Sequence, residues 1–411
     1  MPKLRFPAGR WRPILLAVCV PALLLGCSRG NRLAPFPVAA EIQRLSRGAA
    51  DAPEGLPSWS SDGSKMYLPR HMSGGWRLCE VDVASGEVRA LTDPPPGTLD
   101  VFPQRGPATG SSPNLVVFVR AHTGSAGYDS LMVVDVVTGE SRTLQTRGSG
   151  VPAAFDNMDR PLWSSDGRRI LFGGGPNGAE HLWVLTWPEL VCVDVAGDFS
   201  APRYTSVCKY AWGRVNPASE PGVFYKITYE AVSNGDTRIG VILLRSGCLE
   251  RKLLNKTTLG ASDCGTQIKT DYEFSPSFSP DGARVIFACN YVIAETDITV
   301  EAICPDSLSL LVRNVPRVVD LASSVRCNEF AAWSPDGNSL AIEAGAEGGS
   351  QLWLRRIADR NAVQLTAFPN GVGRYFAAWS PDGRTIAVME RVPVASKADS
   401  TTQRVTLVRG F

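Results

Sequence analysis

The sequence predicts an all-β protein, a β-propeller of four-stranded antiparallel blades. Three observations lead to this prediction. A short phrase with the chemistry of a tight turn occurs five times along the 411 residues. A β-rich run follows each copy. A second phrase, with the pattern strand–turn–strand, recurs at a period of about 50 residues, and internal repetition of this length is typical of propellers and solenoids.

The first phrase consists of an aromatic residue, Ser, Pro or Ser, Asp and Gly, as in PSWSSDGSKMYL at 57–68. Pro presets φ at the second turn position, Asp suits the third, and Gly accepts positive φ at the fourth. Runs such as RILF and TIAV then follow as short strands. The predicted turn residues are Asp62, Gly63, Asp166, Gly167, Asp281, Gly282, Asp336, Gly337, Asp382 and Gly383.

The spacing of the copies predicts seven blades, with six or eight as alternatives. The Asp residues are separated by 104, 115, 55 and 46 positions, so the first two gaps are each long enough to contain one degenerate copy of the repeat. SSPNLVVFVR at 111–120 and SEPGVFYKI at 219–227 are the candidates. The second phrase supports this, because EVDVASGEVRALT at 80–92 and VVDVVTGESRTLQT at 133–146 match closely.

A single blade cannot bury both of its faces, so the blades must stack around an axis. The aromatic residue before each turn is suited to fill the space between blades. These residues are Trp59, Trp163, Phe278, Trp333 and Trp379. EIQRLS at 41–46 resembles the ends of blades yet precedes the first copy, so we expect it to add an outer strand to the last blade and remove an open edge.

The aromatic-Ser-Pro-Asp-Gly phrase and its spacing resemble the TolB-like, WD40-like propeller repeats, which also occur in peptidases of the prolyl-oligopeptidase type. The resemblance covers residues 41 to 411, nearly all of the chain beyond its N-terminal segment. It differs from TolB itself, which carries a separate α/β domain ahead of its propeller and is a soluble periplasmic protein. The resemblance therefore implies the repeat fold and not the role of TolB.

The N-terminus has the pattern of a targeting segment. Basic residues from Lys3 to Arg12 precede the apolar run PILLAVCVPALLL, which is shorter than the roughly 20 residues of a membrane span. Leu24-Leu25-Gly26-Cys27 resembles the lipobox of bacterial lipoproteins. We expect a signal peptide at 1–26, a lipidated Cys27 with a linker at 27–40, and the propeller at 41–411. Ser28 in place of Asp resembles an outer-membrane address facing the periplasm.

Beyond Cys27, eight cysteines follow, and export to an oxidising compartment makes disulfides an expectation. Spacing suggests three local pairs, each closing a short loop: Cys192 with Cys208, Cys248 with Cys264, and Cys289 with Cys304. Cys79 and Cys327 are left over as free thiols. Eight cysteines allow 105 connectivities, so these pairs are hypotheses, and free buried thiols are the alternative.

Composition and motifs argue against several functions. The first 26 residues hold four basic residues and no acid, which leaves 38 basic against 40 acidic residues and gives no reason to expect nucleic-acid binding. There is no Gly-x-Ser-x-Gly elbow, no HExxH and no CxxC. His71, His122 and His181 are scattered, so we expect no metal and no cofactor.

The sequence therefore favours a non-catalytic, lipid-anchored, monomeric propeller that binds an envelope protein or a peptidoglycan-associated component through its loops. A carbohydrate-active enzyme is an alternative, because carboxylates from several blades could meet at the channel mouth without a shared motif. A small-ligand or sugar sensor is a third. Specific activity is expected where the repeat breaks down, at 204–217 and 257–272.

Overall fold

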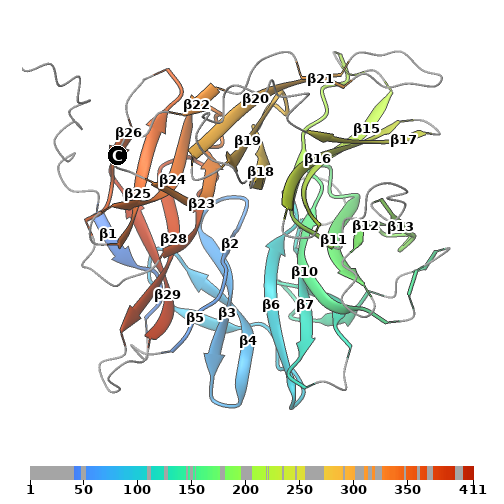
Figure 1. The fold of residues 1–411 in the computed structure, drawn as a ribbon. Coiled ribbons are helices and arrows are strands. Elements are labelled where there is room, and N and C mark those ends of the chain that lie inside the picture. The colour runs from blue at the N-terminus through green and yellow to red at the C-terminus, as the bar shows by residue number, and fades with distance from the viewer. Residues whose placement is uncertain are drawn as a thin grey trace, which may run out of the picture. The chain divides into compact units, whose positions relative to one another are not determined.

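The residues that the structure describes form twenty-nine strands, which group into seven antiparallel sheets. Figure 1 shows their arrangement. The computed structural model describes residues 41–47 and 52–411, except 109–112, 125–127, 145–146, 149–150, 153, 176–180, 196–205, 219, 221, 234–235, 246–247, 255–272, 290–291, 301–309, 313–316, 320–325, 347–348, 359–361, 368–373 and 394–400. All of these belong to one compact unit, Leu33–Phe411. The predicted signal peptide and linker lie outside the described residues.

Each sheet is one blade, and we number the blades in chain order. Blade 1 holds β2 (Ser58–Trp59), β3 (Lys65–Met72), β4 (Gly75–Asp82) and β5 (Val88–Ala90); blade 2 holds β6 (Thr98–Arg105), β7 (Leu115–His122), β8 (Ser130–Asp135) and β9 (Ser141–Thr143); blade 3 holds β10 (Asp156–Trp163), β11 (Arg169–Gly175), β12 (His181–Thr186) and β13 (Cys192–Asp194). Within each blade, neighbours in sequence are neighbours in the sheet.

The remaining blades follow the same order. Blade 4 holds β14 (Ser206–Gly213), β15 (Val223–Ser233), β16 (Asp236–Arg245) and β17 (Cys248–Leu254). Blade 5 holds β18 (Glu273–Phe278), β19 (Arg284–Cys289), β20 (Val292–Val300), β21 (Leu310–Val312) and β22 (Arg317–Val319), the last of which also pairs with β20. Blade 6 holds β23 (Arg326–Trp333), β24 (Ser339–Ala346), β25 (Gly349–Arg356) and β26 (Ala362–Gln364). Blade 7 holds β27 (Arg374–Trp379), β28 (Thr385–Pro393), β29 (Thr401–Arg409) and β1 (Glu41–Arg44).

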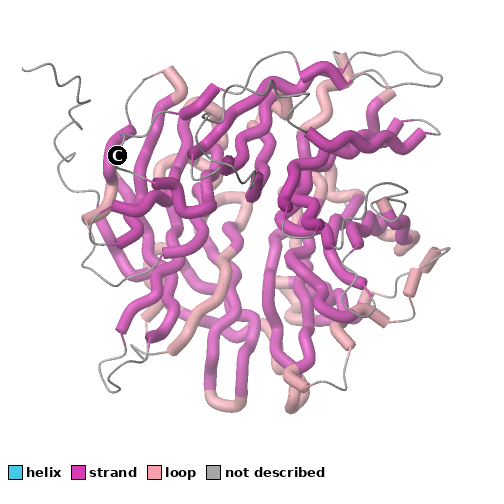
Figure 2. Tube along the Cα trace, viewed as in Figure 1, coloured by secondary structure: helices cyan, strands magenta, loops and turns pink. Residues whose placement is uncertain are grey.

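The described residues are strands and loops (Figure 2). No helix among them is long and apolar enough to cross a membrane.

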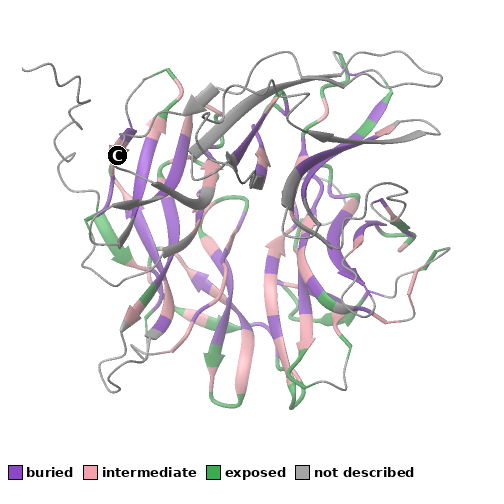
Figure 3. Ribbon diagram, in the orientation of Figure 1, coloured by how far each residue is buried: buried purple, intermediate pink, exposed green. Residues whose placement is uncertain are grey.

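The central strands are buried on both faces because every blade packs between two others. In β11, Ile170 and Phe172 join the apolar cluster that reaches Val117 of blade 2, whereas Leu171 joins the cluster that reaches Ile227 of blade 4. Successive side chains of a strand point to opposite faces, so a run of apolar residues serves both neighbours. The purple segments of Figure 3 follow these central strands. Burial of each such side chain stabilises the fold by about 1.5–3 kcal/mol.

The ring closes between blades 7 and 1, as the sequence predicted. β1 pairs antiparallel with β29, with Glu41 opposite Arg409, and the two strands lie side by side in Figure 1. A cluster that includes Leu45, Met66 and Leu407 fills the space between the two blades. The prediction of an all-β propeller with four-stranded antiparallel blades is confirmed, and the seven sheets match the number of units that the spacing of the copies predicts.

Glu54 lies at this closure and is fully buried. Its side chain accepts hydrogen bonds from Ser46, from Arg70 Nη1 at 2.9 Å and from the backbone N–H of Val405 at 2.7 Å. One carboxylate therefore joins the N-terminal segment, blade 1 and the last blade.

Candidate functional site

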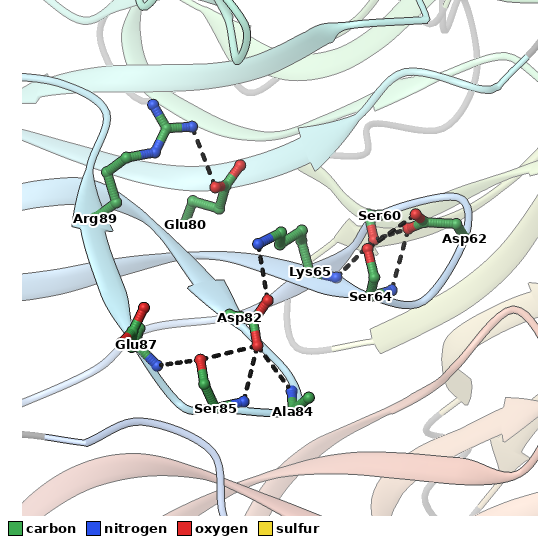
Figure 4. A network of polar contacts seen from close by, with 10 residues as sticks. All are labelled: Ser60, Asp62, Ser64, Lys65, Glu80, Asp82, Ala84, Ser85, Glu87 and Arg89. Atoms are coloured by element: carbon green, nitrogen blue, oxygen red, sulfur yellow. Dashed lines mark hydrogen bonds and ion pairs between the residues drawn. The ribbon is translucent and has the colours of Figure 1, made fainter.

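The five Ser-x-Asp-Gly phrases form the same turn in the structure. In the first, the Gly63 N–H bonds the Ser60 carbonyl at 3.1 Å, and Ser60 Oγ donates to Asp62 Oδ1 at 2.6 Å (Figure 4). Asp62 Oδ1 also accepts the N–H of Ser64 at 3.1 Å, and Ser60 Oγ accepts the N–H of Lys65 at 2.9 Å. Gly63 has φ of 74°, and the other four glycines, Gly167, Gly282, Gly337 and Gly383, have φ of 68° to 72°.

These hydrogen bonds favour the charged form of the aspartates. The Ser60 hydroxyl, followed by the Ser64 groups, lowers the pKa of Asp62 to about 2. Ser334 and Ser380 likewise lower the pKa of Asp336 and Asp382. Burial opposes this effect at Asp166 and Asp281, yet the net pKa of both is still lowered. Each aspartate caps its own turn, so these five residues are not brought together in one site.

The second repeated phrase is tied to the first within blade 1. Asp82 Oδ1 accepts the N–H groups of Ala84 at 3.1 Å and Ser85 at 2.8 Å, while Lys65 Nζ lies 2.8 Å from Asp82 Oδ2 (Figure 4). The hydrogen bond from Lys65, then those from Ser85, hold the pKa of Asp82 well below its usual range. Both phrases are therefore explained by turn geometry.

The predicted inter-blade aromatics lie at the start of each blade. Trp59 Nε1 donates to the carbonyl of Ala378 in β27 at 3.1 Å, and Trp379 Nε1 donates to Ala332 in β23 at 3.0 Å. Each indole thus bonds the innermost strand of the preceding blade. Trp163, Phe278 and Trp333 are buried at the same position. Our sequence reasoning missed Trp212, which makes the same contact with Leu162 at 2.8 Å in blade 4.

The predicted bond between Cys192 and Cys208 is not present, because Cys192 is a free, buried thiol. Cys192 begins β13, the outermost strand of blade 3, whereas Cys208 lies in β14, the innermost strand of blade 4. Burial raises the pKa of Cys192 to about 12. Cys79 is free and buried, as predicted. For the other two pairs, Cys264 and Cys304 lie outside the described residues, so those bonds stay predictions.

The three histidines are not brought together. His71 and His122 are exposed at the ends of β3 and β7. His181 begins β12, and its Nδ1 lies 2.7 Å from Asp194 Oδ2. In the part of the chain that the structure describes, no three His, Cys, Asp or Glu side chains are placed to hold a metal ion.

The candidate site is a cavity of about 1240 Å³ among the first strands of blades 3 to 7. Its walls include Arg160 of β10, Lys209 of β14 and Phe376 of β27. The lining also includes residues of the turn at 164–169 and of the loop at 213–215, several of them exposed, and we call these two segments the rim. Part of the 204–217 segment, where the sequence departs from the repeat, therefore lines this cavity. The 257–272 segment lies outside the described residues.

The wall side chains come from a shared position in the repeat. Arg160, Lys209 and Phe376 each stand three residues before an inter-blade aromatic, Trp163, Trp212 and Trp379 respectively. The ladder is irregular at this level, with register shifts between Asp159 and Leu162, Cys208 and Ala211, and Tyr375 and Ala377. Bulges of this kind redirect side chains. Counting back three residues from Trp163 and Trp379 would have found Arg160 and Phe376, whereas finding Lys209 also required recognising Trp212.

Two of these wall residues hold an uncommon backbone conformation. Lys209 has φ of 44° and Phe376 has φ of 68°, and such left-handed values for residues other than glycine cluster at functional sites. The Arg160 guanidinium lies over the Phe376 ring, 5.7 Å from its centre, so blades 3 and 7 meet across the cavity. The strand irregularities thus aim one cation and one aromatic ring at each other.

Cations outnumber acids among the described residues of the lining. Arg160, Arg168, Arg169, Lys209 and Arg214 face two carboxylates, Asp159 and Asp166. Asp166 Oδ2 pairs with Arg169 at 3.2 Å, and Asp159 Oδ1 lies 3.7 Å from Arg160 Nε. Lys209 Nζ lies 3.6 Å from Glu230. The cavity therefore keeps a positive excess after its ion pairs are formed.

Blade 4 replaces the repeated turn with a different device. Lys226 is fully buried; its Nζ lies 2.7 Å from Glu220 Oε1 and donates to the Gly282 carbonyl of blade 5 at 2.7 Å. Glu220 Oε2 accepts the N–H of Asn216 at 2.9 Å, so it caps the loop that follows Gly213. This buried pair holds the cavity rim without the Asp cap used in blades 1, 3, 5, 6 and 7.

The chain matches no protein-family model and no curated protein. Solved structures do match. An oligogalacturonate lyase in complex with manganese is 11% identical, covers 93% of this chain and 95% of its own, and has a TM-score of 0.58. A prolyl endopeptidase is 13% identical with a TM-score of 0.54, over 86% of this chain and 50% of its own. A TolB from Acinetobacter baumannii is 14% identical, covers 62% of this chain and 53% of its own, and has a TM-score of 0.39.

The likenesses to the lyase and to the endopeptidase, whose TM-scores exceed 0.5, establish the propeller fold alone, because both identities are low. Both of these similar proteins are enzymes, but at such low identity the fold does not decide the function of this chain. Function must therefore be argued from the cavity and its residues.

Proposed function

We propose that this protein is a non-catalytic binding propeller of the bacterial cell envelope, and that its cavity receives part of a partner protein or a cell-wall component. One observation carries the proposal: the described lining combines an excess of cations with aromatic rings, and its two carboxylates are both engaged. Asp166 accepts Ser164 Oγ at 2.6 Å and pairs with Arg169, which leaves it a turn cap. Such a lining suits recognition of an anionic partner.

The membrane attachment is part of this proposal and rests on the sequence. A basic region, an apolar run and Cys27 occur in the order of a lipoprotein signal, and Ser28 suits the outer membrane facing the periplasm. Lipid chains on Cys27 would anchor the protein without spanning the membrane. The propeller would then present its cavity to components of the periplasm.

A carbohydrate-active enzyme is the second candidate. One similar structure that covers most of the chain is an oligogalacturonate lyase, and arginine and lysine side chains could neutralise acidic sugars in either a binding protein or an enzyme. The two candidates differ in what happens to a bound compound.

One experiment on the lipidated full chain separates them. Muropeptides, acidic oligosaccharides and neutral oligosaccharides are each added while the melting temperature is recorded, because a ligand of the folded state raises it. The same samples are then analysed by mass spectrometry. Stabilisation by a compound that is recovered unchanged supports the binding role. If the stabilising compound is converted to a product, the binding role is rejected and the carbohydrate-active enzyme is supported.

Protein partners are tested with a photo-crosslinking amino acid at Phe224, which lines the cavity and is 51% exposed. Val137 is the matched control, since it is 71% exposed and lies in a turn of blade 2 away from the cavity. A specific adduct at Phe224 and not at Val137 supports docking there. Equal labelling of both positions, with no stabilising envelope compound, would contradict the proposal.

A further inference from the structure

The rim of the cavity carries two arginines that form no salt bridge with a described residue, although the charge of Arg168 contributes to the lowered pKa of Asp166. Arg168 and Arg214 are both exposed and both line the cavity. Neither guanidinium makes a hydrogen bond or ion pair with another described side chain, in contrast to Arg160 and Arg169. Guanidinium groups that form no salt bridge are suited to bind carboxylate or phosphate groups in bidentate fashion.

The backbone holds both arginines in place. The Arg168 N–H donates to Asp166 Oδ1 at 3.0 Å within the blade 3 turn. The Arg214 carbonyl packs so closely on Gly282 that a Cβ at Gly282 would lie 2.0 Å from that oxygen. Just before it, Trp212 is fixed to Leu162 of blade 3. The backbone of both residues is therefore held by a hydrogen bond or by close packing, while their exposed side chains extend from it.

An exposed aromatic ring lines the same cavity. Phe224 is 51% exposed although it lines the cavity, whereas the adjacent Tyr225 is buried beneath the Arg169 guanidinium at 5.5 Å. Large aromatic side chains that stay solvent-exposed beside a cavity provide faces on which a ring can stack. The volume of about 1240 Å³ exceeds that needed by a single inorganic anion.

From this geometry we propose that the rim binds a small ligand with two or more negatively charged groups on a ring, the charges meeting Arg168 and Arg214 and the ring stacking on Phe224. The inference deepens the proposed binding function and rests on it. Carboxylates and phosphates satisfy the same guanidinium chemistry, so the charged group can be either. The shared requirement is a ring that bears several negative charges.

The test uses three probes and isothermal titration calorimetry on the full chain. Benzene-1,3,5-tricarboxylate supplies carboxylates on a ring, tripolyphosphate supplies phosphates without one, and 1,3,5-tris(hydroxymethyl)benzene is the neutral ring. We expect the tricarboxylate to bind and the neutral ring not to bind. Tighter binding of the tricarboxylate than of tripolyphosphate supports the ring, and affinity should fall as salt is added. Binding of the neutral ring as tightly as the tricarboxylate would overturn the proposal.

Variants assign the binding to the rim. Replacing either arginine should lower the affinity for the tricarboxylate about tenfold, since a hydrogen bond to a charged group contributes roughly that factor. The double variant Arg168→Gln/Arg214→Gln tests both together. Arg384→Gln is the matched control, because Arg384 is exposed, follows Asp382-Gly383 as Arg168 follows Asp166-Gly167, and lies away from the cavity. Phe224→Ala should lower the affinity for the tricarboxylate and leave the affinity for tripolyphosphate unchanged.

The outcomes keep the two proposals apart. Unchanged affinity in the double variant, or equal weakening in Arg384→Gln, would overturn the assignment to Arg168 and Arg214. If neither anionic probe binds while an envelope partner still crosslinks at Phe224, the anion site fails and the binding function stands. Melting curves of each variant confirm that the fold is retained, which we expect because both arginine side chains are exposed.

Discussion

Replacing Glu54 with Gln should destabilise the ring at its closure. The change keeps the size of the side chain but removes the charge that faces Arg70, whose side chain is 5% exposed. It also places an amide near three donors, Ser46 Oγ, Arg70 Nη1 and the Val405 N–H. Removing one partner of a buried ion pair costs about 3–5 kcal/mol, because the other charge stays buried without compensation.

Urea unfolding followed by the fluorescence of the ten tryptophans measures this free energy. Glu80→Gln is the control, since Glu80 pairs with Arg89 at 3.1 Å and the Arg89 side chain is 53% exposed, so the loss there should be under about 1 kcal/mol. Glu54→Gln/Arg70→Met should be less destabilised than the sum of its single variants, because the stranded cation is gone. A Glu54→Gln protein as stable as the wild type would refute the argument, and strict additivity would show that the two groups do not act as a pair.

Three further outcomes are expected. Trp379→Phe should lose about 1 kcal/mol more stability than Trp333→Phe in the same urea assay, because Trp379 Nε1 bonds Ala332 whereas Trp333 Nε1 has no partner among the described residues. The pKa of Asp62 in the folded protein, about 2, lies below its unfolded value, so the stability that its charge contributes should be present above pH about 4 and lost as the pH falls towards 2. The melting temperature of Asp62→Asn should therefore vary less with pH across that window than that of the wild type. An identical pH dependence of the two melting temperatures would contradict this. Labelled fatty acid should be incorporated into the wild type and not into Cys27→Ala, with equal labelling as the contrary result.

The fold was predictable because its repeated parts carry their own chemistry. A turn that needs Gly at positive φ, as at Gly63 or Gly383, restricts the residue type and so leaves a visible phrase. The closing strand was predictable for a similar reason, since 41–46 has the same pattern as the ends of other blades. The turns and the closing strand could be predicted because local requirements of the backbone restrict their residue types.

The cavity was not predictable in the same way. Arg160, Lys209 and Phe376 share a position but not a chemical type, so no phrase marks them. Their meeting depends on strands more than 200 residues apart, as the contact between Arg160 and Phe376 illustrates. The wrong expectation for Cys192 has a related cause: 16 residues of separation suggested a hairpin, but the chain there passes from the outermost strand of one blade to the innermost strand of the next.

Blade 4 keeps one feature of the repeat and loses another. It keeps the contact that the ring requires, because Trp212 bonds blade 3 as Trp379 bonds blade 6. It gives up the Ser-x-Asp-Gly turn, and the buried pair of Lys226 and Glu220 supports the rim in its place through Gly282 and Asn216. Because the pair supplies this support from within, the loop after Gly213 is released from the turn sequence and can present Arg214 to the cavity. The departure of blade 4 from the repeat is therefore the change that gives the cavity rim one of its two arginines that form no salt bridge.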